Sequence, residues 1–178
     1  MVVLLISAGV WVSASAALVP LLARDYAAGG VRPLTGVLWH ALNYTLLALF
    51  ALEDVWALGL GDPLRVLGAF LTALGLIVIA AGFHEFRSVG RLTGTRQDEL
   101  VDSGIYRFSR HPQYLGIILT LIGAGLAGDS AAAVLFALCL SAGLLVYLPF
   151  EERYAARAFG AQYESYRSRV PMLIGPLG

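Results

Sequence analysis

The chain has 178 residues, of which 58% are hydrophobic and only 13% are charged, against about 25% charged in a typical soluble domain. A soluble fold of this length could not bury so much apolar surface, so the composition argues against one and favours a single-domain protein of the lipid bilayer. The formal net charge is zero, and it gives no indication of a nucleic-acid partner.

Charge-free runs of 18 to 23 residues recur along the chain, each close to the ~20 residues that a helix needs to cross the hydrocarbon core. They are Met1–Ala23, Pro33–Leu52, Val66–His84, His111–Gly128 and Ser130–Phe150. We therefore expect an all-α fold, an integral membrane bundle of five transmembrane helices in one domain. The expected spans are about 1–23, 33–52, 64–84, 112–128 and 130–150, with a cytoplasmic amphipathic C-terminal helix at 151–169.

The first two spans carry few polar residues. Ser13–Ala17 in the first span resembles a signal-peptide cleavage site, but no basic residue precedes it, and we interpret the segment as a helix. His40 lies inside the second span. Two roles remain open for it: a hydrogen-bonded packing role, or a role in a substrate pocket.

The third span begins with Asp62-Pro63, an acidic cap followed by a proline that suits the first helical turn. Within the span, Gly68, Gly75 and Gly82 recur every seven residues and so lie on one face of a helix. Small residues on one face favour close approach of a neighbouring helix in a membrane bundle.

The fourth and fifth spans are joined by a short segment that contains Gly128 and Asp129, which predicts a tight turn and an antiparallel hairpin. Beyond Phe150 the chain becomes charged and shows a broad apolar-aromatic face at helical spacing. This pattern predicts a helix that docks on the cytoplasmic mouth of the bundle or lies in the membrane interface.

All twelve basic residues are arginines, and their distribution predicts the orientation. If the five runs all cross the membrane, Arg65 lies on one side and the other eleven lie on the opposite side: Arg24, Arg32, Arg87, Arg91, Arg96, Arg107, Arg110, Arg153, Arg157, Arg167 and Arg169. Positive charge marks the cytoplasmic side. We expect the inner or plasma membrane of a prokaryote, with the N-terminus outside and the active site facing the cytoplasm.

Acidic and basic groups should meet at the cytoplasmic mouth. Arg110 and His111 directly precede Pro112, where a helix N-terminus favours an anion. Glu151 and Glu152 end the fifth span, and the hairpin brings them to the same side of the membrane. Taken alone, these residues could equally be solvated helix ends that form structural ion pairs.

Two blocks in the second half of the chain resemble the signature of the isoprenylcysteine carboxyl methyltransferase and phospholipid methyltransferase superfamily. The first is Gly104–Gly116, with its Arg-His-Pro-x-Tyr-x-Gly core; the second is Glu151-Glu152 followed by Phe159-Gly160-x-x-Tyr163-x-x-Tyr166 and Val170-Pro171. The resemblance covers about 100–171. It implies an enzyme that holds S-adenosylmethionine at the cytosolic mouth, while a lipophilic small-molecule or lipid acceptor enters from the bilayer.

The resemblance also implies roles for individual residues. Residues that would shape the cofactor pocket are Tyr106, Arg110, His111, Pro112, Tyr114, Gly116, Glu151 and Glu152. Glu151, Glu152 and His111 are the candidates for a catalytic base, should the acceptor arrive protonated. Candidate substrate contacts are Tyr147, Arg153, Tyr163, Tyr166 and Arg169.

Tyr147 departs from the family pattern, because the carboxyl methyltransferases carry an arginine four residues before the first glutamate. A tyrosine there suits a neutral or amine-bearing head group better than a carboxylate, unless an arginine such as Arg153 or Arg169 substitutes.

Two other functions are compatible with this region. One is an NADPH-dependent membrane sterol or enone reductase, but a pair of glutamates is a poor neighbour for the cofactor's extra phosphate. The other is a non-enzymatic membrane scaffold that has kept the fold. The single Cys139 has no ligand spacing around it, and we expect no metal.

Overall fold

The computed structural model describes residues 2–54, 62–86 and 99–174, and this part of the chain is helical, without a β-strand. The elements are α1 (Val2–Ala27), α2 (Pro33–Asp54), α3 (Pro63–Phe86), the short 3-10 helix η2 (Gly104–Arg107), α5 (Pro112–Ala127), α6 (Ala131–Phe159) and α7 (Ala161–Arg167). The prediction of an all-α fold is confirmed for these residues. The sequence also predicts a turn at Thr93-Gly94-Thr95, and these residues lie outside the described part.

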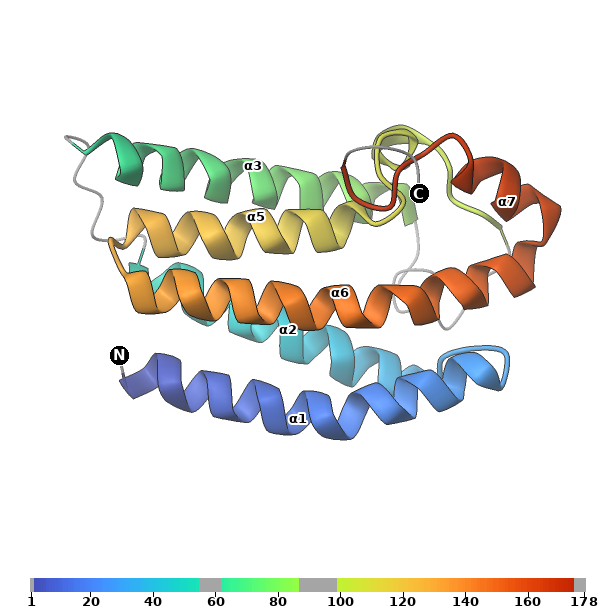
Figure 1. The fold of residues 1–178 in the computed structure, drawn as a ribbon, viewed down its shortest axis with the longest axis horizontal. Helices are drawn as coiled ribbons and strands as arrows, with labels where there is room; N and C mark the ends of the chain where they lie inside the picture. Colours follow the sequence, from blue (N-terminus) through green and yellow to red (C-terminus); the bar gives the residue numbers. More distant parts are fainter. Residues whose placement is uncertain (1, 55–61, 87–98, 175–178) are drawn as a thin grey trace.

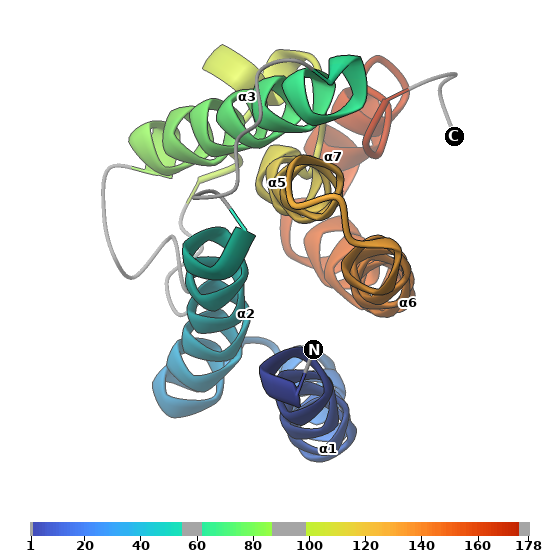
Figure 2. The same cartoon turned by 90° about the vertical axis from the view of Figure 1, so that its left-hand side faces the viewer.

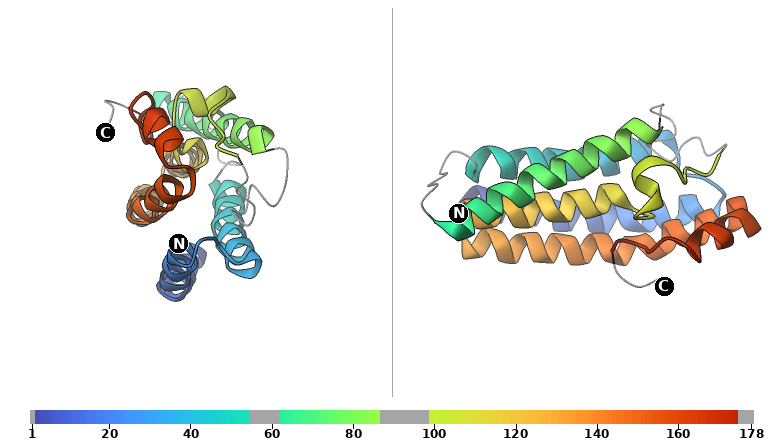
Figure 3. Two further views of the ribbon diagram at one scale, coloured as in Figure 1. Left: turned by 90° about the vertical axis from the view of Figure 1, so that its right-hand side faces the viewer. Right: turned by 90° about the horizontal axis from the view of Figure 1, so that it is seen from above.

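The long helices run back and forth in one elongated bundle (Figure 1). α5 lies in the middle and packs most extensively against α3, then against α6 and α2, while α1 contacts α2 and α6 (Figure 2). The end of α1, the start of α2, the end of α3, the start of α5 and the end of α6 therefore gather at one end of the bundle. α7 lies at that same end (Figure 3).

Two helices of the described chain are long and apolar enough to cross a membrane: α3, and the part of α6 from Ala133 to Phe159. α5 is also apolar but shorter. Side chains on the outer faces, among them Phe70 and Ile77 of α3 and Leu135 of α6, are large, hydrophobic and exposed. The topology with five membrane spans stays a prediction.

The close approach of α3 and α5 depends on glycine. A Cβ atom added at Gly75 would lie 2.6 Å from the carbonyl oxygen of Gly116, and one added at Gly68 would lie 2.7 Å from the carbonyl oxygen of Gly123. Both distances are far below van der Waals contact, so the two backbones touch only because these side chains are absent. The sequence-based expectation of a small-residue contact face on the third span is confirmed.

Short polar contacts fix both ends of the bundle. At one end Asp62 caps α3 by accepting from the amide of Leu64 at 2.8 Å, and Arg65 pairs with Asp129 in the turn between α5 and α6 at 2.9 Å. At the other end the buried carboxylate of Asp25 accepts from the guanidinium of Arg32 at 2.7 Å across the turn between α1 and α2.

The C-terminal part differs from the single helix expected at 151–169. α6 continues without a break to Phe159 and ends at Gly160, whose φ of +52° is in the left-handed region. The short α7 follows, and the chain then turns back to the start of α5. There the carbonyl oxygens of Pro171 and Met172 accept hydrogen bonds from the amides of Arg110 and His111 at 3.0 and 3.1 Å.

Candidate active site

Four charged side chains meet where α5 begins and the last turns of α6 pass it. Arg110 and His111 come from the segment that leads into α5, and Glu151 and Glu152 come from α6. Pro112 occupies the first turn of α5 and is buried, which fixes the direction in which the helix starts. The expected meeting of acidic and basic groups at this end is therefore present in the structure.

The guanidinium of Arg110 is buried, and most of its donors are used inside the protein. Its Nε and Nη2 donate to the two carboxylate oxygens of Glu152 at 2.9 and 3.0 Å, a bidentate pair. Its Nη1 donates to the main-chain carbonyls of Arg167 and Val170 at 3.1 and 2.6 Å. Arg110 thus ties the end of α6 to the chain that follows α7.

His111 lies between the two carboxylates. Its Nε2 is 2.8 Å from Oε1 of Glu152, and its Nδ1 is 3.3 Å from Oε2 of Glu151. Because an ionised carboxylate only accepts, an imidazolium, which donates from both ring nitrogens, is the form of His111 that matches these two neighbours. Together with Arg110, the cluster holds two positive and two negative charges and is balanced.

For His111, Glu151 and Glu152, hydrogen bonds outweigh the effect of burial on the pKa. Burial alone would lower the pKa of His111, but its bonds to Glu151 and Glu152 raise that pKa above its ordinary value of 6.5. Burial alone would raise the pKa of Glu152, but bonds from His111 and Tyr163 help to bring it down to about 2. The pKa of Glu151 is also lowered, because contact with His111 outweighs its burial.

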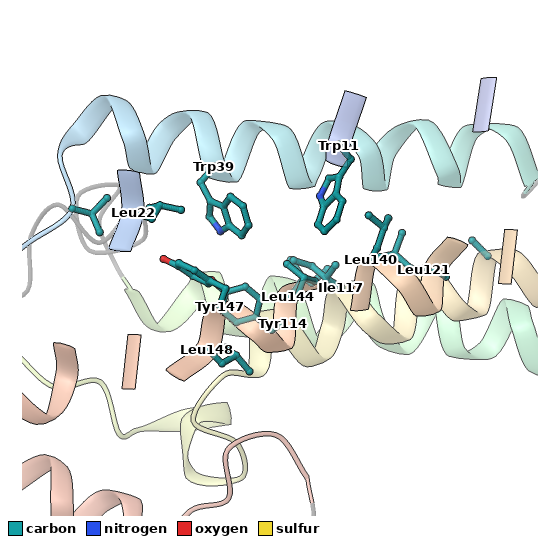
Figure 4. Close-up of a cluster of buried hydrophobic side chains, with 14 of the residues drawn as sticks. Trp11, Leu22, Trp39, Tyr114, Ile117, Leu121, Leu140, Leu144, Tyr147 and Leu148 are labelled. Atoms are coloured by element: carbon teal, nitrogen blue, oxygen red, sulfur yellow. The ribbon is translucent and has the colours of Figure 1, made fainter. Parts of the chain in front are cut away.

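Aromatic side chains surround Glu151. The hydroxyls of Tyr114 and Tyr26 donate to its Oε1 at 2.9 and 3.1 Å. Tyr147 is buried and donates to the hydroxyl of Tyr26 at 2.9 Å, and its ring packs on Trp39 with centroids 5.0 Å apart. Figure 4 shows the rings of Trp39, Tyr114 and Tyr147 together, contributed by α2, α5 and α6.

The tyrosines of the tail hold the C-terminal segment in place. Tyr163 contacts Glu152, and its pKa is raised by burial and by that carboxylate. Tyr166 is buried and donates to the carbonyl oxygen of Tyr106 at 2.7 Å. The ring of Tyr106 is in turn packed edge-on against Phe86 at the end of α3. Tyr166 and Tyr106 therefore connect α7, η2 and α3, and Tyr163 reaches the charged cluster through Glu152.

Three predicted site residues lie apart from this cluster in the structure. Gly116 faces α3, where an added Cβ would lie 2.7 Å from the carbonyl oxygen of Gly75. Arg153 is exposed and places its guanidinium 5.4 Å from the ring centroid of Phe150. Arg169 is exposed and donates to the carbonyl oxygen of Ser165 at 3.0 Å.

The expectation that the start of α5 offers amide groups to an anion needs correction at two positions. The amides of Arg110 and His111 already donate to the chain's own C-terminal segment. Sequence reasoning also missed Tyr26, which crosses from α1 to Glu151. It follows Arg24 and Asp25 at the end of the first charge-free run, where an aromatic residue is typical of any membrane interface.

Comparison with known proteins identifies the class to which this fold and this cluster belong. Residues 64–162 match the model of a family described as phospholipid methyltransferase, and the match contains all four charged residues of the cluster. This chain belongs to that family and, with it, to the superfamily of isoprenylcysteine carboxyl and phospholipid methyltransferases.

Several curated relatives are similar to parts of the chain. Protein-S-isoprenylcysteine O-methyltransferase B of Arabidopsis thaliana is 28% identical over 65% of this chain and 58% of its own length. Methanethiol S-methyltransferase 2 of Bradyrhizobium diazoefficiens is 44% identical over 39% of this chain and 26% of its own length. Protein-S-isoprenylcysteine O-methyltransferase of Schizosaccharomyces pombe is 30% identical over 69% of this chain and 50% of its own length.

The chain thus spans about a quarter to three fifths of the length of these relatives. No solved structure gives a significant match.

Proposed function

We propose that this protein is an integral membrane methyltransferase that uses S-adenosylmethionine and methylates a small lipophilic or lipid-like acceptor. The observation that carries the proposal is the bridged cluster of Arg110, His111, Glu151 and Glu152, inside the region that matches the family model. Ion pairs at solvated helix ends are exposed and contribute little to stability. This cluster is balanced in charge and partly buried, which favours a site over a set of solvated helix ends.

The chemistry of these side chains fits such a cofactor. S-adenosylmethionine carries an ammonium and a sulfonium, two ribose hydroxyls and one carboxylate. Glu151 is the less enclosed carboxylate, with a side chain 22% exposed against 12% for Glu152, and the rings around it suit a cation. We assign to Glu151 the cationic or ribose part of the cofactor, with Tyr114 and His111 as neighbouring contacts.

The remaining residues of the cluster hold this arrangement. Glu152 is paired with Arg110 on both oxygens and fixes His111, so its role is to position the imidazolium against Glu151. Tyr106 and Pro112 place the segment that carries Arg110 and His111. In this assignment Arg110 acts on the cofactor through Glu152 and the C-terminal segment.

When bound, the cofactor supplies a methyl group on a sulfonium for direct transfer to a nucleophile. The protein then has to align the acceptor, exclude water and keep the cofactor's cation beside Glu151. The aromatic side chains of Tyr26, Tyr114 and Tyr147 border Glu151 on the side of the bundle interior, and they suit the alignment of the acceptor and the exclusion of water. A base is needed only where the acceptor arrives protonated.

The proposal includes a topology and a class of acceptor. Five spans, an outside N-terminus and a cytoplasmic site follow from the charge-free runs and the arginine asymmetry. Two of the relatives are named for isoprenylcysteine, a lipophilic acceptor. A lipophilic acceptor of this protein would enter laterally from the bilayer. We expect poor activity on prenylcysteine carboxylates, because Tyr147 is neutral and Arg153 and Arg169 are exposed and turned to other contacts.

Calorimetric titration of the purified protein in detergent tests the function. We expect binding of S-adenosylmethionine and of its demethylated product, and no binding of NADPH. Binding of NADPH without S-adenosylmethionine would contradict the proposal and favour a reductase. Binding of neither would favour a scaffold.

A further inference from the structure

A side chain of α1 reaches the charged cluster from outside the region that matches the family model. Tyr26 lies in the last turn of α1, and the end of α1 lies beside the last part of α6 (Figure 1). The hydroxyl of Tyr26 donates to Oε1 of Glu151 at 3.1 Å, across 125 positions of the sequence. Tyr26 is buried. The first helix therefore contributes a polar contact to the proposed cofactor site, although the family match begins at residue 64.

The position of Tyr26 is fixed from two further sides. The hydroxyl of Tyr147 lies 2.9 Å from that of Tyr26. The ring of Tyr26 packs on the ring of Tyr154 with centroids 5.1 Å apart, and Tyr154 donates its hydroxyl to the carbonyl oxygen of Gly29 at 2.9 Å. Because an ionised carboxylate only accepts, Tyr26 gives its one hydroxyl hydrogen to Glu151, and Tyr147 must then be the donor to Tyr26. The direction of both hydrogen bonds is thereby fixed.

The two oxygens of Glu151 have different partners. Oε1 accepts from the hydroxyls of Tyr26 and Tyr114 at 3.1 and 2.9 Å. A carboxylate oxygen has two lone pairs, so these two hydrogen bonds fill Oε1. Among the described residues, Oε2 has the contact with Nδ1 of His111 at 3.3 Å, which is long for a charge-assisted hydrogen bond. Oε2 therefore keeps room for a further donor, and the Glu151 side chain is partly exposed to one.

A phenol suits the place of Tyr26 for an electrostatic reason. It is neutral, so its hydrogen bond orients the carboxylate and leaves the negative charge of Glu151 in place. An arginine in the same place would form an ion pair with Glu151, and a cation of the cofactor would have to compete with that pair. Two phenols on Oε1 thus fix the direction of Glu151 without cancelling the charge that a cationic cofactor needs.

From this geometry we propose that Tyr26 is a positioning residue of the cofactor site: its hydroxyl, supported by Tyr147, holds Oε1 of Glu151 and so presents Oε2 to the cationic or ribose part of S-adenosylmethionine. This inference rests on the proposed function, and it adds to that function a residue of α1 and the oxygen that the cofactor uses. Tyr26 acts on the cofactor through Glu151.

Calorimetric titration of the full chain in detergent with S-adenosylmethionine tests the role of Tyr26. Tyr26→Phe keeps the ring and removes the hydroxyl, and we expect it to weaken cofactor binding about threefold to tenfold. Tyr154→Phe is the matched control, because it removes a hydrogen bond between α6 and the turn after α1 but does not touch Glu151. Tyr154→Phe should bind the cofactor as wild-type protein does.

A double-mutant cycle separates the positioning of Glu151 from a general loss of packing. Because Tyr26 acts through the charge of Glu151, Tyr26→Phe should cost little further affinity in a chain that already carries Glu151→Gln. Thermal unfolding of each variant reports whether it is folded. Tyr26→Phe leaves the hydroxyl of Tyr147 without its acceptor, so a second variant combines Tyr26→Phe with Tyr147→Phe, which removes both hydroxyls and keeps both rings. The same loss of affinity is expected from it.

Each outcome bears on a different claim. Wild-type affinity in Tyr26→Phe, an equal loss in Tyr154→Phe, or an undiminished further loss in the Glu151→Gln chain would overturn the positioning role of Tyr26. Each of these results leaves the methyltransferase function standing, since wild-type protein still binds the cofactor. Absence of S-adenosylmethionine binding to wild-type protein would overturn the proposed function itself, and this inference with it.

Discussion

Glu151 and Glu152 are adjacent in the sequence but have different surroundings. Glu152 accepts from the buried guanidinium of Arg110 with both oxygens, whereas Glu151 accepts from the hydroxyls of Tyr26 and Tyr114. A glutamine in place of Glu151 could still accept both tyrosine hydroxyls. A glutamine in place of Glu152 would leave a buried guanidinium without a counter-charge. We therefore expect Glu152 to be the structural carboxylate of the pair and Glu151 the binding one.

We accordingly predict that Glu152→Gln lowers the free energy of unfolding by about 3 kcal/mol and Glu151→Gln by roughly 1 kcal/mol. Thermal unfolding in detergent measures both. Glu151→Gln should bind S-adenosylmethionine at least tenfold more weakly despite its near-normal stability. Equal stability of the two variants would contradict the division of roles, and wild-type cofactor binding by Glu151→Gln would contradict its assignment.

The site should also make stability depend on pH in a defined window. The pKa of His111 is raised, so its contribution is complete below its ordinary value of 6.5 and is lost as the pH rises through the raised pKa. The pKa of Glu152 is lowered from 4.5 to about 2, so its contribution is present above 4.5 and is lost as the pH falls toward 2. We expect the highest unfolding temperature between these limits, and a fall on the alkaline side that His111→Gln removes.

Buffered detergent solutions between about pH 4 and pH 9 would show this window. An unfolding temperature that stays constant in wild-type protein from pH 6 to pH 9 would mean that His111 is not an imidazolium between two carboxylates.

At the level of elements, α3 and α5 form the most extensive contact, and glycines on both helices make the close approach possible. Gly116 was grouped with the cofactor residues by family resemblance, yet it lies against Gly75 and Ile79 of α3. Sequence spacing alone predicted that Gly68, Gly75 and Gly82 share a face, since a helix returns to nearly the same direction every seven residues. It did not reveal that glycines of the fourth span are the other half of that contact.

We predict that Gly75→Ala destabilises the protein by about 1 to 3 kcal/mol, because the new methyl group meets main-chain atoms that cannot rotate away. Gly9→Ala in α1 is the matched control, since an added Cβ there has nothing within 4 Å. Thermal unfolding of the two variants decides between helix packing and a general effect of glycine replacement. Equal behaviour of both would show that the two backbones can separate at little cost.

Most helix ends could be read from the sequence, because local residues determine them. Asp62 and Pro63 do start α3, and the turn at Gly128 and Asp129 does separate α5 from α6. The break at Gly160 was not foreseen, since the apolar stripe of the tail continues on both sides of it. The hydrogen bonds from Arg110 to the end of the chain also could not be foreseen. They join residues about 60 positions apart through main-chain carbonyls, which no side-chain pattern records.

At the scale of the whole molecule, the charged cluster and the tail gather at one end of the bundle, and the turn between α5 and α6 lies at the other. The arginine asymmetry predicts that the cluster end faces the cytoplasm. The orientation follows from the charge distribution and is independent of the chemistry of the site, so it needs its own test.

We predict that Ser165→Cys is labelled by an impermeant thiol reagent only after the cells are opened, and that Leu64→Cys is labelled in intact cells. Both side chains are exposed; Ser165 belongs to α7 and Leu64 to the first turn of α3, and α7 and the start of α3 lie at opposite ends of the bundle (Figure 1). The experiment uses a Cys139→Ala background, which removes the native cysteine. The reverse labelling pattern would invert the topology and move the site to the outer face.

The backbone pairing of Arg110 and His111 with Pro171 and Met172 has a consequence for truncated chains. A chain cleaved ahead of Val170 would keep the helices α1 to α7 but would lose the carbonyl oxygens that accept from these two amides and from Nη1 of Arg110. The buried guanidinium would then have fewer acceptors, so we expect such a chain to keep its helices and to lose the fixed geometry of the charged cluster.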